Sequence, residues 1–115
     1  NPEEFIREFL AENSVSISEI DAIILGNNGD SHYDGIYENL SGSLFKENPQ
    51  ISFKNVLGEF DTVNAIAVEI ALKVFEYQKI PLSLKMNNLD RNSYRKILIY
   101  NQRRGKNHSC ILLEN

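Results

Sequence analysis

The stretch AIILGNNGD, residues 22–30, decides the class of fold. Four apolar residues in a row are followed at once by glycine, asparagine and aspartate, which favour turns. A short apolar run that ends at turn residues is typical of a strand buried on both faces, as in the interior of a parallel sheet. We therefore predict an interior strand over residues 22–25 and a loop directly after it.

Helical patterns lie on both sides of this strand. Pro2 followed by two glutamates is typical of a helix start, and residues 36–45 carry apolar side chains at roughly helical intervals. Over residues 60–75 apolar side chains keep steps of three or four, which indicates a helix with a wide apolar face. This helix is expected to end before Pro81, because the residue before a proline is steered away from the helical region.

Extended segments alternate with these helices. Strands are expected over residues 51–54, 96–100 and 109–113. The last two flank a glycine-containing connection at residues 103–106, so we predict a hairpin there. The resulting order α-β-α-β-α-β-β predicts an α/β fold, in which helices pack on a mixed sheet of parallel strands and one antiparallel pair.

The composition is that of one globular domain. The chain has 115 residues, of which 42% are hydrophobic and 24% charged, and a typical domain of ~100–150 residues leaves no room for a second core. A net charge of −4 disfavours a nucleic-acid partner. No apolar run reaches the ~18 residues of a membrane span. The single cysteine cannot form an internal disulfide, so we expect a soluble, cytoplasmic protein.

Three stretches at the strand-to-loop junctions resemble the C-terminal half of a β-ketoacyl-acyl-carrier-protein synthase, which has a thiolase-like fold. IDAIILGNNGDSHYD (20–34) resembles the family's ID-hydrophobic-HGTGT-x-x-x-D segment. SFKNVLGEFDTVNA (52–65) resembles SxKsxxGHxxxAAG, and NQRRGKNHSCILL (101–113) resembles the terminal FGFGGTN hairpin. The resemblance spans nearly the whole chain and implies a thiolase-like half-domain.

The departures from the family pattern fall at its catalytic positions. Its two catalytic histidines fall at Gly26 and Glu59, whereas its lysine is kept as Lys54 and its hairpin asparagine as Asn107. In the family these histidines donate hydrogen bonds to the acyl carbonyl and the developing enolate, and loss of one such donor commonly costs ~10²–10³ in rate. An ionised Glu59 in the first turn of a helix would also repel a malonyl carboxylate. We therefore expect a degenerate catalytic site.

The remaining positions of the resemblance imply structural roles or none. Asp34 is expected to fix its loop and Gly58 to open the long helix. The family's nucleophilic cysteine lies in an N-terminal half that this sequence does not contain. Cys110 does not replace it, because a thiol within an apolar strand is protonated and inert. We expect the sequence to be a fragment of a longer chain.

A basic cluster lies in the connection of the predicted hairpin. Arg103, Arg104 and Lys106 form either a solvated turn or, on the alternative interpretation, a contact with an acidic acyl carrier protein. The phosphopantetheine of such a carrier would bring the acyl substrate. The chain is expected to hold no cofactor of its own.

Two loop patterns resemble binding sites, one for phosphate and one for a metal ion, but each has a simpler interpretation. Residues 26–30 have the glycine content of a phosphate-binding loop, but a plain turn explains them better. Asp30, His32 and Asp34 alternate, and would converge on a metal ion only if the segment were extended. Solvated side chains are the simpler interpretation, so no metal site is expected.

By resemblance, the half-domain has five strands, with the first strand in the middle of the sheet. No segment of this sequence corresponds to that first strand. Its removal would leave two rows of unpaired backbone groups. Three solutions are open. The chain continues upstream, a neighbouring chain supplies the strand, or the four strands repack. The first is the simplest.

The resemblance gives the expected function. We expect a non-catalytic β-ketoacyl-synthase-like protein of fatty-acid or polyketide-type biosynthesis, which forms a homodimer or a heterodimer with a synthase-type subunit, as chain-length factors do. The first alternative is a divergent acyltransferase whose nucleophile lies in the missing half. The second is a binding module that keeps only the fold and is unrelated to acyl chemistry.

Overall fold

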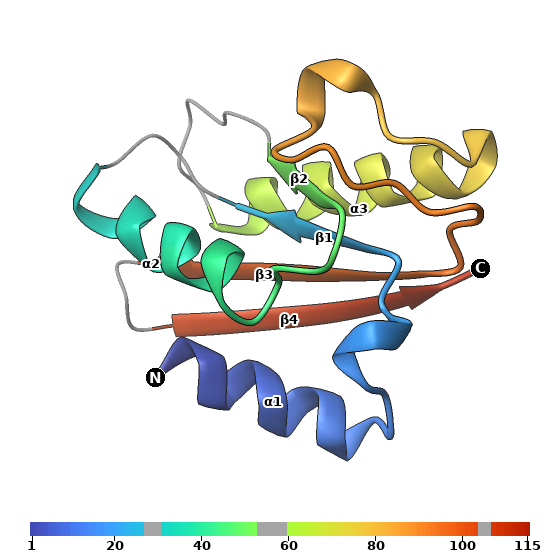
Figure 1. Ribbon diagram of the computed structural model, residues 1–115. Helices are drawn as coiled ribbons and strands as arrows, with labels where there is room; N and C mark the ends of the chain where they lie inside the picture. The colour runs from blue at the N-terminus through green and yellow to red at the C-terminus, as the bar shows by residue number, and fades with distance from the viewer. Residues whose placement is uncertain (27–30, 53–59, 104–106) are drawn as a thin grey trace.

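The chain folds into a four-stranded mixed sheet with helices on both faces (Figure 1). The computed structural model describes residues 1–26, 31–52, 60–103 and 107–115, with the backbone alone at 31–34, 60–62 and 103. The predicted order of helices and strands is confirmed. The elements are α1 (Pro2–Glu12), η1 (Ile17–Glu19), β1 (Ala22–Leu25), α2 (Ser31–Gly42), β2 (Gln50–Ser52), α3 (Phe60–Tyr77), η2 (Leu82–Leu84), β3 (Lys96–Arg103) and β4 (Asn107–Glu114).

The strands lie in the order β2-β1-β3-β4, and the predicted α/β class is correct. β1 runs parallel to β2 and to β3, whereas β3 and β4 form the predicted antiparallel hairpin. Leu25 at the end of β1 pairs with Ser52 on one side and with Tyr100 on the other. The carboxyl ends of β1 and β2 therefore lie at one edge of the sheet, and β3 continues past that edge to Arg103.

The sheet contains no gap where a central strand is missing. β1 pairs directly with β3, from Ala22 opposite Ile97 to Leu25 opposite Tyr100. Within the described residues the four strands pair with one another in the way that the third solution, repacking of the four strands, describes. The physical reason is that the two strands satisfy each other's backbone donors and acceptors, which would be costly to leave unpaired.

The hairpin strands are longer than the sequence pattern predicted. Pairing continues to Arg103 opposite Asn107, so both residues belong to strands rather than to the connection. The pattern missed these ends because Asn101, Gln102 and Arg103 are polar, and period-two alternation is lost there. Backbone pairing between adjacent strands does not require apolar side chains.

The two faces of the sheet bury different helices, with α2 in front of the sheet and α3 behind it in Figure 1. Ile24 of β1 points toward α3, where Val63 and Ala67 pack on it, and Ile23 points toward α1 and α2. Both side chains are fully buried, as the apolar run predicted. Within the described ranges, none of the helices combines the length and the apolar character that crossing a membrane would need.

Both outer strands of the sheet have a covering segment. Beyond β2, Met86 donates its N–H to the carbonyl of Gln50 over 2.9 Å. Along β4, α1 lies beside the strand, and the ring of Phe5 is 5.1 Å from that of His108 (Figure 1). Such covers reduce the tendency of a sheet edge to pair with another chain.

Truncation of Ile24 to alanine tests the central place of β1. Because the side chain is 0% exposed and packs against α3, we expect the free energy of unfolding to fall by about 2–5 kcal/mol. Urea unfolding followed by circular dichroism measures the change. Leu72→Ala is the matched control: Leu72 is 55% exposed, so its truncation should cost less than about 0.5 kcal/mol. Equal costs for the two variants would contradict the assignment of β1 as the core strand.

Candidate functional site

Polar side chains gather where β1 ends and β3 continues. Gly26 is the last described residue after β1, and its N–H donates to the carbonyl of Tyr100 over 3.3 Å. Beyond that point β3 carries Asn101 and Gln102, which are only 3% and 8% exposed. Open α/β sheets commonly place ligand sites at the carboxyl ends of adjacent strands. This polar end of β1 and β3 is the candidate site.

Two hydrogen bonds fix the amide oxygen of Asn101. Its Oδ1 accepts from the Tyr37 hydroxyl over 3.1 Å and from the N–H of Gln102 over 2.9 Å. The same Gln102 N–H lies 3.1 Å from the Tyr37 hydroxyl oxygen, which it also approaches as donor. Since both partners of Oδ1 are donors, this atom is the amide oxygen, and the network ties α2 to β3.

No side chain fits at position 26. A Cβ added to Gly26 would lie 2.6 Å from Asn101 Oδ1 and 3.0 Å from Val63 Cγ1. Both distances are shorter than ordinary van der Waals contact, and Asn101 is held by its hydrogen bonds. Val63 belongs to the first turn of α3, so the end of β1, the start of α3 and the amide of Asn101 meet at one point.

Amide oxygens with no donor surround this point. The Oε1 of Gln102 and the Oδ1 of Asn64 are buried, and in the described part of the chain neither has a hydrogen-bond partner. The Nδ2 of Asn64 donates weakly to the hydroxyl of Ser109, over 3.5 Å. The described cluster thus consists of amides and hydroxyls. Its described members include no imidazole, carboxylate or thiol for acid–base or nucleophilic chemistry.

A second polar contact lies on the α1 side of the same strands. The Tyr100 hydroxyl is 2.7 Å from Nδ1 of His108, and the His108 ring also packs against Phe5. Burial raises the pKa of Tyr100 well above its usual value and lowers the pKa of His108. A neutral His108 ring that carries its proton on Nε2 accepts a hydrogen bond at Nδ1 from the Tyr100 hydroxyl.

The lone cysteine lies on β4, on the same face as α1. Burial raises the pKa of Cys110 to about 12, so the thiol is protonated near neutral pH. A protonated thiol is neither a nucleophile nor a metal ligand. This agrees with the inert role that the sequence predicted.

The structure describes only some of the residues singled out in the sequence. Gly26 lies in the cluster, and Asn107 is exposed at the start of β4, opposite Arg103. Asp34 lies in α2 and Arg103 in β3, but their side chains are not among the described ones. The residues outside the described ranges are Lys54, Gly58, Glu59, Arg104 and Lys106.

The residues that form the cluster were not singled out by the sequence reasoning. Tyr37 was assigned only to the apolar stripe of its helix, and Asn101 and Gln102 appeared only as the start of the stretch 101–113 that resembles the terminal hairpin. The sequence did contain a signal for Asn101 and Gln102. They are polar and directly follow the apolar run of a buried strand, and ligand sites in open α/β sheets form at such strand ends. What the sequence does not contain is the contact between Tyr37 and Asn101, which are 64 positions apart.

The described residues contain no group of three or more histidines, cysteines or carboxylates that could hold a metal ion. In the alternation of Asp30, His32 and Asp34, the first residue lies outside the described ranges. From Ser31 onward the backbone is helical, so the extended geometry that metal binding would need is absent. Apart from Gly26, the suggested phosphate loop also lies outside the described ranges.

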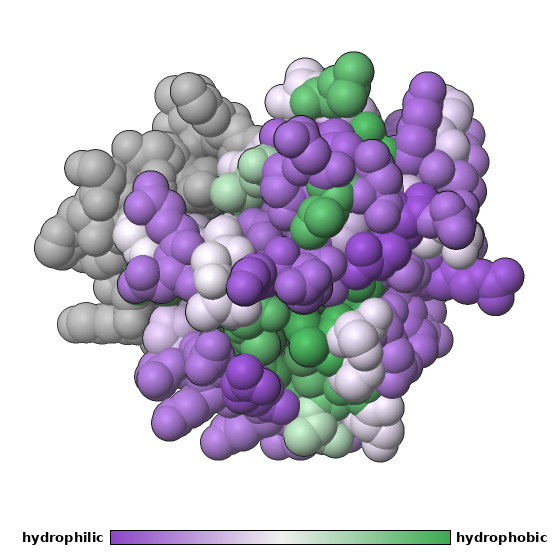
Figure 2. Space-filling view, in the orientation of Figure 1, coloured by the Kyte–Doolittle hydropathy of each residue, from purple (hydrophilic) through white to green (hydrophobic). Residues whose placement is uncertain are grey.

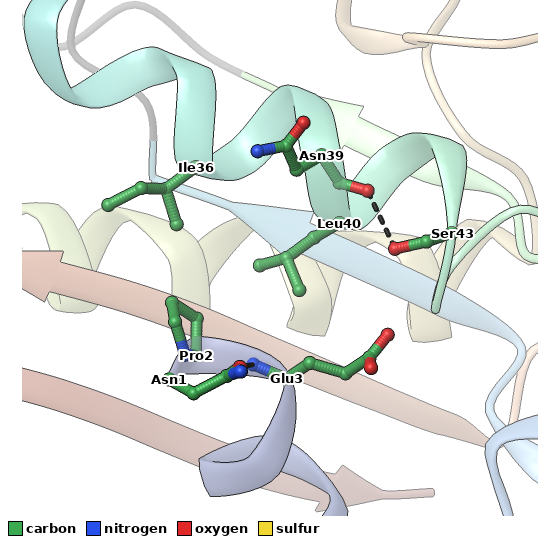
Figure 3. Close-up of a pocket in the computed structure, with 7 residues that line it drawn as sticks. All are labelled: Asn1, Pro2, Glu3, Ile36, Asn39, Leu40 and Ser43. Carbon is green, nitrogen blue, oxygen red and sulfur yellow. Dashed lines mark hydrogen bonds between the residues drawn. The ribbon is translucent and has the colours of Figure 1, made fainter.

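A separate cleft of about 420 Å³ lies between the first turn of α1 and α2 (Figure 3). Pro2, Ile36 and Leu40 supply apolar surface. The polar groups there serve their own helices: the Asn1 side chain accepts from the N–H of Glu3 over 2.9 Å, and the Ser43 hydroxyl donates to the Asn39 carbonyl over 2.7 Å. This cleft holds no acid–base pair suited to catalysis.

Comparison of the chain with protein-family models, with curated proteins and with solved structures gives no match. The fold is therefore described by its own topology, a sheet of order β2-β1-β3-β4. Function is inferred from the residues and from their geometry.

Gly26→Ala tests the crowding at the end of β1. The new methyl group must displace Asn101 or Val63, so we expect a loss of about 1–3 kcal/mol in the free energy of unfolding. In an Asn101→Ala background the same change should cost less, because the obstructing amide is gone. Gly35→Ala is the control, since a Cβ there meets nothing within 4 Å. A cost for Gly26→Ala that is unchanged by removing Asn101 would contradict the contact.

The stability of the chain should fall in mild acid because of His108. Its pKa in the folded state lies below the usual value of 6.5. The unfolded chain therefore takes up the proton first as the pH falls through about 6.5, and folding loses stability there. Chemical unfolding between pH 5 and 8 should show a steeper loss for the natural chain than for His108→Gln. Parallel pH profiles would contradict the buried, neutral histidine.

Proposed function

We propose that the chain is a β-ketoacyl-synthase-like subunit of fatty-acid or polyketide-type biosynthesis that does not condense acyl groups itself and instead pairs with an active condensing partner. The observation that carries the proposal is the occupied space at Gly26. Where the resemblance places a catalytic imidazole, a Cβ alone would lie 2.6 Å from Asn101 Oδ1.

The group next to Gly26 is a hydrogen-bond acceptor, whereas condensation needs a hydrogen-bond donor there. Decarboxylation of a malonyl group develops negative charge on a carbonyl oxygen, which requires hydrogen-bond donors aimed at it. The nearest atom to position 26 is an amide oxygen, fixed as an acceptor by the Tyr37 hydroxyl and the Gln102 N–H. An acceptor at this place repels an enolate. This supports a non-catalytic role over the alternative of a divergent acyltransferase.

The second catalytic position belongs to the same part of the fold by sequence. Glu59 directly precedes α3, which begins at Phe60, and Val63 in the first turn of α3 lies against position 26. A carboxylate at the start of a helix is favoured in its ionised form. By sequence, an acidic residue thus stands where the family has its second imidazole, and the family's lysine is kept as Lys54.

A carrier protein is the proposed source of any acyl group. Acyl carrier proteins are acidic, and the sequence from the last residue of β3 onward carries Arg103, Arg104 and Lys106 in a chain whose net charge is −4. Local positive charge on an acidic protein favours one docking site over the rest of the surface. With this role the protein would act in the cytoplasm and need no cofactor of its own.

One observation favours a second candidate function, a binding module unrelated to acyl chemistry. The resembled half-domain has a strand between those that correspond to β1 and β3, whereas here the two strands pair directly. Because β1 and β3 pair directly, the sheet leaves no place between them for a strand from a synthase-like half. Under this reading the amide cluster at Asn101 is simply a site that accepts hydrogen bonds.

Binding and turnover with recombinant malonyl-acyl carrier protein test the proposal. We expect carrier binding but no decarboxylation above the rate without protein. Replacing Arg103, Arg104 and Lys106 by alanine should weaken carrier binding by about tenfold or more, because the attraction is electrostatic. The matched control replaces Arg7, Lys46 and Lys79, which are exposed and remove the same charge elsewhere.

Each outcome separates the candidates. Decarboxylation that disappears in Glu59→Ala would contradict the non-catalytic proposal and support the acyltransferase. Equal weakening by both triple variants would contradict docking at the hairpin. Failure to bind either the carrier or a condensing subunit would contradict the proposal and favour the unrelated binding module.

A further inference from the structure

The cover that α1 gives β4 is incomplete, because it leaves the outer backbone groups of the strand without partners. At the opposite edge of the sheet, the N–H of Met86 donates to the carbonyl of Gln50 in β2. Among the described residues no hydrogen bond joins α1 to β4, although α1 runs along the strand on the side away from β3 (Figure 1). The two elements meet through side chains, such as the rings of Phe5 and His108. One edge of the sheet is therefore closed by a hydrogen bond, whereas the other is covered by side chains alone.

The register of the hairpin shows which groups of β4 face outward. In an antiparallel ladder, pairs of residues that exchange hydrogen bonds alternate with pairs that do not. Directly after the strand, Asn115 donates its N–H to the carbonyl of Arg95 over 2.8 Å, so this pair is a hydrogen-bonded one. The carbonyl of Tyr100 agrees, because it turns away from β4 to accept from Gly26. Counting in steps of two, the N–H and C=O groups that point away from β3 are those of residues 108, 110, 112 and 114.

The sequence of β4 contains none of the usual protections of an edge strand. Natural edge strands are commonly guarded by proline, by charged side chains or by a bulge. Residues 108–113 contain no proline, lysine, arginine, aspartate or glutamate, and the pairing with β3 runs without a bulge. Ile111, Leu112 and Leu113 are only half-buried, whereas Leu98 and Ile99 on β3 are fully buried. β4 therefore has the composition of an inner strand that lacks one neighbour.

We propose that β4 is a docking edge for an extended segment of a different protein, which adds to the sheet as a fifth strand and is apolar in its middle and basic at its ends. The outward N–H and C=O groups of β4 pair with the backbone of this segment, as in other cases of strand addition. The half-buried apolar side chains of β4 thereby gain a neighbour on their open side. This inference does not depend on the proposed function.

The apolar part of the expected segment follows from α3. The Nδ2 of Asn64 donates to the hydroxyl of Ser109 over 3.5 Å, so this side of α3 faces β4. Val68, Leu72 and Phe75 follow Asn64 by four, eight and eleven residues and lie on the same side of the helix. Leu72 is 55% exposed there. A strand added to β4 would run beside these apolar side chains, so we expect its own residues on that face to be apolar.

The basic part follows from the charges of α1. Glu8 and Glu12 follow Phe5 by three and seven residues, so they lie on the side of α1 that contacts His108. Both are exposed, and α1 carries four glutamates and one arginine. Figure 2 shows a hydrophilic surface over the first turns of this helix, at the lower left. Two copies paired through antiparallel β4 strands would bring two such acidic helices together on one face, so charge favours a different, basic partner.

Binding of short synthetic peptides with blocked ends tests the inference. Each peptide has alternating valine and threonine in its middle, and it is flanked by lysines in one version and by glutamates in the other. We expect the lysine peptide to bind and the glutamate peptide to bind about tenfold more weakly or less, because the acidic side of α1 repels it. A lysine peptide with N-methyl groups on alternate residues lacks the donors of one edge and should not bind. Fluorescence anisotropy of the labelled peptides measures all three affinities.

Amide hydrogen exchange of the same chain locates the bound peptide. In the free chain the outward N–H groups of Cys110 and Leu112 should exchange readily, and the lysine peptide should slow their exchange by about tenfold or more. Ile111 and Leu113 are the internal control, because their N–H groups already bond to β3 and should change little.

A charge reversal on α1 tests the choice of partner. The double variant Glu8→Lys, Glu12→Lys should bind the lysine peptide about tenfold more weakly and the glutamate peptide more tightly. Glu38→Lys with Glu47→Lys is the matched control, since both residues are exposed and lie away from β4. Circular dichroism confirms that both variants are folded.

Several results would overturn the inference. They are failure of the lysine peptide to bind, equal weakening by both double variants, and slow exchange of Cys110 and Leu112 in the free chain. Binding of the N-methylated peptide would exclude strand addition. Protection of β4 that appears without peptide, as the chain associates with itself, would make a second copy the occupant.

Discussion

The direct pairing of β1 with β3 is the interaction on which the rest of the structure depends. It places the apolar run 22–25 inside the sheet, where helices cover both faces, and it satisfies the backbone groups that a missing neighbour would leave exposed. This pairing ends at Leu25 opposite Tyr100, so β3 continues past Gly26 paired only with β4. Asn101 and Gln102 therefore stand at the end of β1, between helices that cover opposite faces of the sheet.

At this end of the sheet, the residues that pack around Gly26 also decide which hydrogen-bonding groups are present there. Glycine at position 26 lets the amide of Asn101 approach the backbone, and the hydrogen bonds from Tyr37 and Gln102 hold that amide with its oxygen toward the glycine. The arrangement stabilises the junction of α2, α3 and β3. Under the function proposed above, the same amide oxygen is an acceptor at a place where acyl transfer would need a donor. A structural role for the cluster is compatible with that proposal.

Much of the fold could be predicted because it depends on local patterns. The apolar runs of β1 and β3, the three- and four-residue steps of α3 and the turn residues between them identify the elements and their order. The ends of β3 and β4, at Arg103 and Asn107, could not be predicted, because the side chains there are polar and show no strand pattern. The sequence pointed to the ends of the strands as the place for a site, but Tyr37, Asn101 and Gln102 were missed because the contact between α2 and β3 joins distant segments.

The sequence by itself determined the α/β class, the succession of elements and a glycine where the resembled family has an imidazole. Only the tertiary structure decided that β1 and β3 are neighbours and that an amide oxygen faces Gly26. The physical reason is the range of the interactions. Hydrophobic periodicity and turn preferences act over a few residues, whereas strand order and side-chain contacts across 64 positions arise from packing of the whole chain.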